Sequence, residues 1–168
     1  MALSGIFLAL SLVVLFVASI VPGIELTVLA LSGVLVMIIV NELSIRGGVV
    51  FFVGSVVLAF LIVPNKSILL IYSFIFGPYS IIKMVIEKYA NNKIIQYILK
   101  IIAFNFLLGA GFFIFKEAFF AGVELPGLAW YLILAGAQII LILYDFILTL
   151  VMSLYEKIIP EAIRKMRG

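Results

Sequence analysis

The chain has 168 residues, of which 67% are hydrophobic and 11% are charged, with a net charge of +3 at pH 7. Soluble domains carry about 25% charged residues, so this composition excludes an ordinary soluble domain and indicates an integral membrane protein. The chain has no Cys and no His, which excludes disulfides, thiol and serine–histidine catalysis, and the usual zinc sites.

Long apolar runs follow one another along the chain, separated by short clusters of charged and turn-forming residues. A membrane-spanning helix needs about 20 predominantly apolar residues, so each run predicts one span. In chain order, the predicted spans are residues 3–21, 26–42, 48–63, 67–89, 94–115 and 127–158. The sequence therefore predicts an all-α polytopic membrane protein, with six transmembrane helices in a single domain over residues 1–168.

Two features modify this simple pattern. Gly77 and Pro78 interrupt the fourth run. Proline lacks a backbone N–H and clashes with the preceding turn, so we expect a kink there. The sequence leaves open whether this span is one kinked helix or two pieces. A longer loop is predicted over residues 116–126, between the last two spans.

The distribution of basic residues predicts the orientation. Lys66 and Lys116 fall in connections on one side of the predicted spans, and the other nine of the eleven cations fall on the side of both termini. Those nine are Arg46, Lys83, Lys88, Lys93, Lys100, Lys157, Arg164, Lys165 and Arg167. The positive-inside rule places this side in the cytoplasm. We therefore expect a multi-pass protein of a bacterial plasma membrane, in contact with the lipid bilayer, with both termini inside.

Polar side chains inside a bilayer are costly and need partners. Asn105 and Gln138 are predicted near the midplane, and Lys100 and Asp145 in the inner half of the last two spans. The structural interpretation is that Asn105 bonds Gln138, and that Lys100 forms an ion pair with Asp145, which keeps the helices in register. The functional alternative is that Asn105 and Gln138 line a ligand pocket.

The ligand-pocket hypothesis extends to other polar groups of the spans and of the outer connections. Tyr72 and Tyr144 are further hydroxyl groups within spans, while Glu25, Asn65 and Lys66 lie in outer connections. Together these connections are expected to form a lid over a pocket open to the outside. The alternative is that they are solvated turns, in which proline and asparagine end the helices.

Small residues on the first span suggest a contact surface. Gly5 and Ala9 are four residues apart, which places them on one helix face where another helix can approach closely. The functional interpretation is a docking face for another membrane subunit. The alternative is ordinary packing within the chain.

The sequence lacks the motifs of the common catalytic classes. It contains no Walker-type glycine-rich loop and no G-x-S-x-G motif, so neither nucleotide hydrolysis nor serine catalysis is indicated. The carboxylates are scattered without paired spacing. We therefore expect a protein that is not an enzyme and that has no catalytic residues, no cofactor, no metal site and no nucleic-acid partner.

The architecture resembles one known family. Six short spans, cytoplasmic termini and a first helix that reads FLALSL over residues 7–12 and ends in IVP at 20–22 are similar to the substrate-binding S component of energy-coupling factor (ECF) transporters. Gly5 and Ala9 stand where that family uses small residues to meet its coupling subunit, although the first position is usually alanine. The resemblance implies capture of a small organic micronutrient from the outside. Transport would then require a separate transmembrane coupling subunit and two ATPases.

Two other functions remain open. One is a non-catalytic membrane scaffold, similar in size and span number to the rod-shape protein MreD. The other is a lipid-binding protein, for which we expect a lateral groove near Gly77 and Pro78. Polar groups that converge beneath the outer connections favour a binding protein, whereas apolar filling of that region favours a scaffold.

Overall fold

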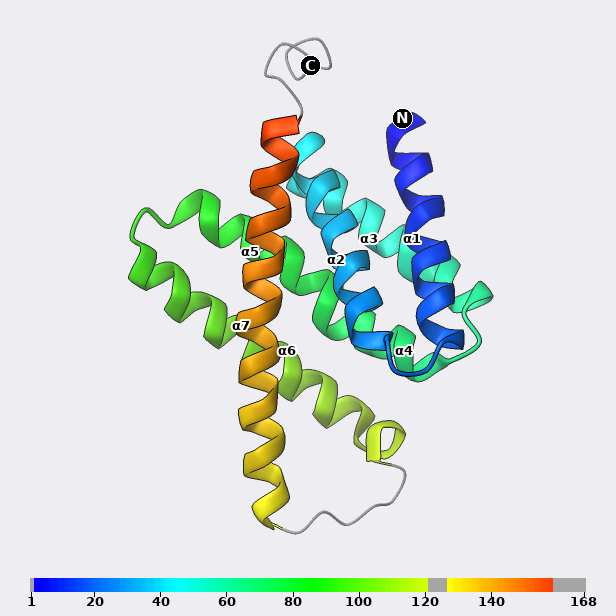
Figure 1. Cartoon of the computed structure of the whole chain (residues 1–168), viewed down its shortest axis with the longest axis vertical. Helices are drawn as coiled ribbons and strands as arrows, with labels where there is room; N and C mark the ends of the chain where they lie inside the picture. Colours follow the sequence, from blue (N-terminus) through cyan, green and yellow to red (C-terminus); the bar gives the residue numbers. More distant parts are fainter. Residues whose placement is uncertain (1, 121–126, 159–168) are drawn as a thin grey trace. The chain divides into compact units, whose positions relative to one another are not determined.

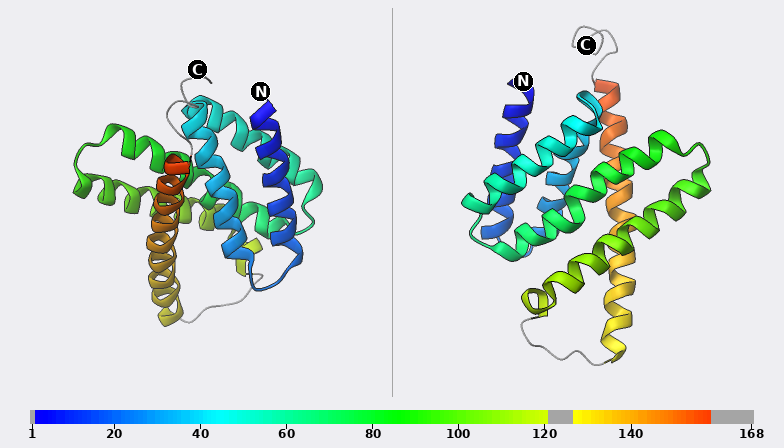
Figure 2. Two further views of the ribbon diagram at one scale, coloured as in Figure 1. Left: turned by 45° about the horizontal axis from the view of Figure 1, so that its top comes forward. Right: turned by 180° about the vertical axis from the view of Figure 1, so that it is seen from behind.

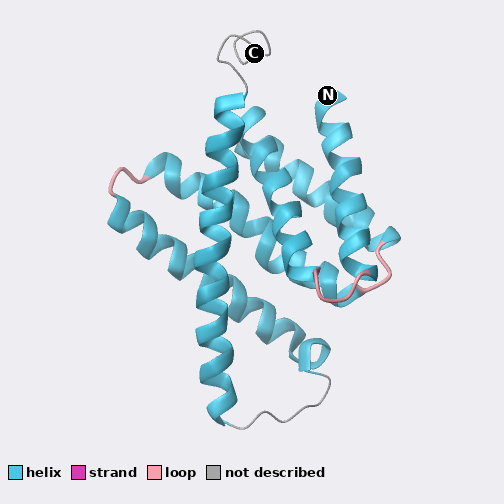
Figure 3. Ribbon diagram, in the orientation of Figure 1, coloured by secondary structure: helices cyan, strands magenta, loops and turns pink. Residues whose placement is uncertain are grey.

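The computed structural model describes residues 2–120 and 127–158, and within these ranges the chain forms helices and short connections without β-strands (Figure 3). The first compact unit contains α1 to α6, and the second contains α7. Each unit is described by itself.

The helices follow one another with short connections (Figure 1). Their bounds are α1 (Ala2–Ile20), α2 (Glu25–Glu42), α3 (Ile45–Ile62), α4 (Lys66–Ile71), the π-helical turn η1 (Tyr72–Phe76), α5 (Gly77–Tyr89), α6 (Lys93–Phe120) and α7 (Gly127–Ile158). The segments α4, η1 and α5 follow without a break and form one long helix. This answers the question that the sequence left open, because the fourth run is one helix.

The all-helical fold predicted from the sequence is confirmed. Among the described residues, five helices are long and apolar enough to cross a membrane: Glu25–Glu42, Ile45–Ile62, Lys66–Tyr89, Lys93–Gly111 and Ala135–Lys157. The apolar part of α1, Ser4–Ile20, is shorter than these five. The chain therefore has the helices of a membrane protein, while the sixth span and the cytoplasmic placement of the termini stay predictions.

Helix α2 is the central helix of the first unit. It contacts α1, α3, α5 and η1, and 61% of its span is buried compared with 22% for α3. Its sequence is apolar on all sides, which suits a helix surrounded by protein. Figure 1 shows α1 beside α2, and the second view of Figure 2 shows α5 and α6 running antiparallel. The first unit is thus built around α2.

The irregularity in the fourth span lies one turn earlier than predicted. The sequence predicts a kink at Gly77 and Pro78, but the structure has a π-helical turn over Tyr72–Phe76, and Pro78 stands at the start of α5. A proline ring clashes with the carbonyl four residues before it, here that of Phe74. The wider π turn contains this carbonyl, and both prolines and π turns are recognised sites of irregularity in helices.

The predicted loop over residues 116–126 is partly wrong. Helix α6 continues to Phe120, so Lys116 and Glu117 are helical. Residues 121–126 lie outside the described part of the chain. The other predicted bounds agree with the observed helices to within three residues. The error has a simple cause, because a mixed Lys–Glu pair ends an apolar run without ending a helix.

Gly77 provides a test of the packing at the π turn. A Cβ atom built on Gly77 would clash with Cε2 of Phe52, whereas a Cβ on Gly54 would have nothing within 4 Å. We expect Gly77→Ala to lower the free energy of unfolding by about 2 kcal/mol, because overpacking displaces the ring. The matched variant Gly54→Ala should be neutral or slightly stabilising. Thermal unfolding in detergent compares the two, and equal melting temperatures would contradict the packing assignment.

Candidate functional site

Three hydroxyl groups meet inside the first unit, where α1, α3 and η1 come together. Tyr72 of η1, Ser55 of α3 and Ser11 of α1 are all fully buried. The Ser55 hydroxyl donates to the Phe52 carbonyl at 2.7 Å, and its oxygen lies 2.8 Å from the Tyr72 hydroxyl. Because a serine hydroxyl has a single proton, Tyr72 is the donor to Ser55. We call these three residues the hydroxyl cluster.

Ser11 is the third member of this cluster, and its hydrogen bonding differs from that of the other two residues. Ser11 is a second hydrogen-bonding neighbour of the Tyr72 hydroxyl beside Ser55, although the Ser11 oxygen has no partner in full hydrogen-bond geometry among the described residues. A buried polar group without a partner costs about 1–3 kcal/mol. The Tyr72 hydroxyl donates its hydrogen bond to Ser55, so its oxygen can still accept a hydrogen bond from another group. The cluster therefore contains hydrogen-bonding capacity that the helices alone do not use.

The hydroxyl cluster lies deep within the predicted spans. Ser11 is the central residue of α1, which places it about 14 Å from either helix end at 1.5 Å per residue. Half of a bilayer's hydrocarbon core is about 15 Å, so this residue lies near the midplane if α1 crosses the membrane. Tyr72 is six residues from the start of α4, or about 9 Å, and so lies nearer to the predicted outer side.

Aromatic packing fixes the position of the tyrosine ring. The rings of Phe52 and Tyr72 lie 5.7 Å apart between centroids at a tilt of 58°, a favourable offset geometry. The same Phe52 ring packs over Gly77. The π turn, the glycine and the phenylalanine thus hold one tyrosine hydroxyl in place. π turns occur frequently at functional sites, and in this unit the π turn contributes the tyrosine of the hydroxyl cluster.

A second polar cluster, which we call the ionic cluster, links α5 to α6 through Lys83, Glu87 and Lys100. Glu87 accepts from two lysines through one oxygen, with Lys83 Nζ at 2.5 Å and Lys100 Nζ at 2.7 Å. Lys83 is fully buried, and Glu87 is about one third exposed. A buried charge needs a partner, so this ionic cluster holds the α5–α6 hairpin together. The spacing of Lys83 and Glu87, four residues apart on one helix, was visible in the sequence, although the bond to Lys100 was not.

The structure gives Lys66 a capping role at the end of α3. Its ammonium group donates to the carbonyls of Phe60 at 2.6 Å and Val63 at 2.9 Å. It also lies 4.8 Å from the centre of the Phe60 ring. The last carbonyls of a helix have no partner within the helix, and a cation there also interacts favourably with the helix dipole.

Two other predicted ligand residues form local bonds in the connections. Asn65 accepts from the Ser67 N–H at 3.0 Å as the N-cap of α4. Glu25 accepts from the N–H of Gly23 at 2.9 Å, where the chain turns with a φ of 91° that favours glycine. These bonds form the two turns. A further role of Glu25, Asn65 and Lys66 in ligand binding stays a prediction.

The predicted pairs between the last two spans involve both compact units. Asn105 is exposed and donates to the Ile101 carbonyl at 2.8 Å. Gln138, Tyr144 and Asp145 belong to α7, in the second unit. The pairs Asn105–Gln138 and Lys100–Asp145, and the place of Tyr144 in a pocket, therefore stay predictions. The structure adds that Lys100 already binds Glu87.

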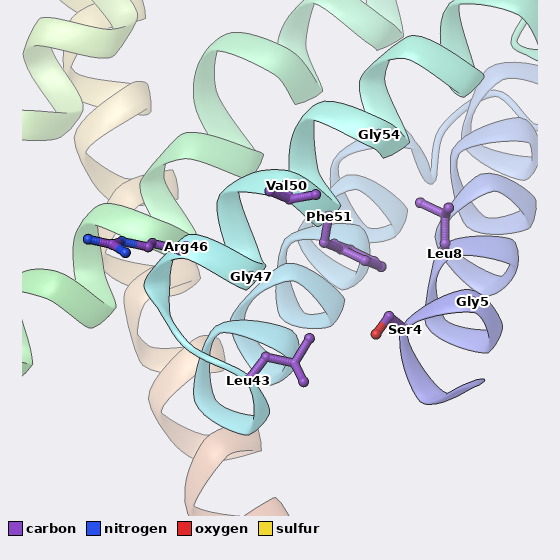
Figure 4. A pocket seen from close by; sticks show the side chains of 9 residues that line it. All are labelled: Ser4, Gly5, Leu8, Leu43, Arg46, Gly47, Val50, Phe51 and Gly54. Atoms are coloured by element: carbon purple, nitrogen blue, oxygen red, sulfur yellow. The ribbon is translucent and has the colours of Figure 1, made fainter. Parts of the chain in front are cut away.

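An open groove of about 500 Å³ lies between the N-terminal halves of α1 and α3 (Figure 4). It is lined by Ser4, Gly5, Leu8, Leu43, Arg46, Gly47, Val50, Phe51 and Gly54. Gly5 and the nearby Ala9 are exposed on α1. Of the residues that line this α1–α3 groove, Gly5 was predicted as a docking residue, and the groove itself was not predicted. The lateral groove predicted for a lipid-binding protein was expected elsewhere, at Gly77 and Pro78.

Comparison of the chain with protein-family models, with curated proteins and with solved structures finds no match. Within the described residues, no group of three or more His, Cys, Asp or Glu side chains gathers as a metal site.

The ionic cluster leads to a stability prediction. Glu87→Gln removes the charge that faces the buried Lys83, so we expect a loss of unfolding free energy on the order of 3 kcal/mol. Lys88→Gln changes an exposed charge one residue away and should change stability by less than about 0.5 kcal/mol. Thermal unfolding of both variants in one detergent measures the difference. Equal stability would show that Glu87 does not neutralise Lys83.

Proposed function

We propose that this chain is a membrane-embedded binding subunit that captures a small organic molecule from the outside and has no motor of its own. The observation that supports this most is the hydroxyl cluster: a buried tyrosine on a π turn, held by Ser55, with the Ser11 hydroxyl beside it but outside full hydrogen-bond geometry. Transporters place their substrate sites near the midplane, where a helix departs from regular geometry. The cluster combines these two properties.

The chemistry of the cluster defines the ligand class. Hydroxyl groups donate and accept hydrogen bonds without carrying charge, and Phe52 adds an aromatic face beside Tyr72. A neutral molecule with a hydroxyl, carbonyl or amide group on a small apolar or aromatic body suits this combination. Small-ligand sites typically join a few polar groups to a mostly apolar lining.

The position of Tyr72 supports entry from the predicted outer side. Only the short helix α4, which begins at Lys66, separates this residue from the connection that ends at Asn65. The Tyr72 hydroxyl therefore lies nearer to the predicted outer side than the ionic cluster does. In this proposal, uptake is completed by a separate transmembrane coupling subunit and ATPases, as the resemblance to ECF S components implies.

A scaffold role is the second candidate, and the capping bonds favour it. Glu25, Asn65 and Lys66 serve the ends of their helices and turns, so their polarity is explained without a ligand. A scaffold needs no more than this. The two candidates differ in what they predict for the hydroxyl cluster. A binding protein has a ligand that forms a hydrogen bond with Ser11, whereas a scaffold has no ligand there.

Ligand binding tests the first candidate. The purified full-length chain is heated with a panel of vitamins, amino acids and nucleobases, because a ligand that prefers the folded state raises the melting temperature. We expect a positive shift with at least one neutral compound. Tyr72→Phe should weaken its binding about 3- to 10-fold, the value of one hydrogen bond. Tyr89→Phe, on a tyrosine that is 71% exposed, serves as the control.

The two candidates give different outcomes in this experiment. Stabilisation that is unchanged by Tyr72→Phe would place the ligand away from the hydroxyl cluster. Absence of any ligand, both in the panel and among small molecules released from the purified protein, would favour the scaffold.

The α1 surface provides a test of the expected partner. Ala9 is exposed, and a small residue there permits close approach of another helix. When the chain is produced together with a coupling subunit and its ATPases, we expect Ala9→Leu to reduce the co-purified complex at least 10-fold. Val17→Leu, on a residue that is turned away from the Gly5–Ala9 face of the same helix and is 37% exposed, should preserve it. A complex that survives Ala9→Leu would exclude this docking face.

A further inference from the structure

The α1–α3 groove exists because side chains are missing from its walls. Gly5 on α1 and Gly54 on α3 both line it, and a Cβ atom built on either would meet nothing within 4 Å. The remaining lining is mostly apolar, with Leu8, Val50 and Phe51 on its walls. Figure 4 shows Ser4 and Leu8 on the α1 side, opposite the start of α3. An apolar groove in a bilayer is filled by lipid chains or by another helix.

The length of the groove favours a lipid chain over a partner helix as its occupant. Along α3 its lining extends from Arg46 to Gly54, eight residues or about 12 Å. This is close to the thickness of one leaflet's hydrocarbon layer, about 15 Å. A transmembrane helix of a partner crosses both leaflets and would find a groove for only part of its length. One acyl chain of one leaflet fits the observed extent.

The charge at the end of the groove indicates the headgroup. Arg46 stands in the first turn of α3, is exposed, and forms no ion pair with any described residue. Figure 4 shows its guanidinium extending from the edge of the groove on the side away from α1. A guanidinium binds phosphate oxygens through two parallel hydrogen bonds. The predicted orientation places this end at the cytoplasmic headgroup layer, where anionic lipids attract basic residues.

We propose that the α1–α3 groove binds one anionic phospholipid of the cytoplasmic leaflet. One acyl chain lies along Gly5 and Gly54, and the phosphate contacts Arg46. This site is separate from the hydroxyl cluster and does not depend on the proposed ligand. Its occupant is a structural or regulatory lipid of the subunit.

Native mass spectrometry tests this assignment on the full-length chain. The protein is delipidated in detergent and titrated with phosphatidylglycerol or with phosphatidylcholine of the same acyl chains. We expect one phosphatidylglycerol to be retained about 10-fold more tightly than phosphatidylcholine. Arg46→Gln should remove this preference. The control Lys93→Gln removes another exposed cation on the same predicted side and should leave the preference intact.

A second pair of variants tests the acyl chain. Gly54→Leu should fill the groove and reduce retention of both lipids at least 5-fold, whereas Val53→Leu, on an adjacent residue that is 52% exposed, should not. Unchanged melting temperatures would show that Gly54→Leu remains folded, and Gly54→Ala provides a milder substitution with the same expected direction.

Two outcomes would overturn the proposal. Equal retention of the two lipids, unaffected by Arg46→Gln, would show bulk lipid only. Unchanged lipid retention in Gly54→Leu, together with loss of the complex with a coupling subunit, would assign the groove to a protein partner.

Discussion

The constraint on which this structure depends is that a polar group in a bilayer must find its partner within the protein. The helices satisfy the hydrogen bonds of the backbone, so the polar side chains of the first unit are left to find partners. Lys66 serves the last carbonyls of α3, and Glu87 neutralises Lys83 and binds Lys100. Ser55 satisfies Tyr72. Among the described residues, Ser11 and the side-chain nitrogen of Asn41 depart from this pattern, and Ser11 belongs to the hydroxyl cluster that we propose as a binding site.

The long helix formed by α4, η1 and α5 organises both polar clusters. Tyr72 and Lys83 lie on it eleven residues apart, or about 16 Å. One cluster is therefore placed near the predicted outer half and the other near the inner half of the membrane. Pro78 lies between them, close to the widened turn. The irregular turn near Pro78 thus lies between the neutral hydroxyl cluster and the charged ionic cluster.

The spans were predictable because hydropathy is a local property of the chain, and their bounds follow directly from it. Tyr72 was also identified, as a hydroxyl within an apolar run. Its partners Ser11 and Ser55 were not, because pairing between distant helices leaves no trace in local composition. The bond from Glu87 to Lys100 was missed for the same reason. The α1–α3 groove could not be predicted from the sequence either. It depends on two glycines that lie on different helices, and their joint effect appears only once the two helices are placed side by side.

The cap formed by Lys66 has a mechanical consequence. Lys66 is the first residue of α4, and its ammonium group binds carbonyls at the end of α3, so the side chain ties the two helices together across their connection. Ser55 and Tyr72 both belong to these two helices and their continuation, while Ser11 belongs to α1. The Ser55–Tyr72 bond therefore lies within elements that this cap joins, whereas a separate helix contributes the third hydroxyl of the cluster.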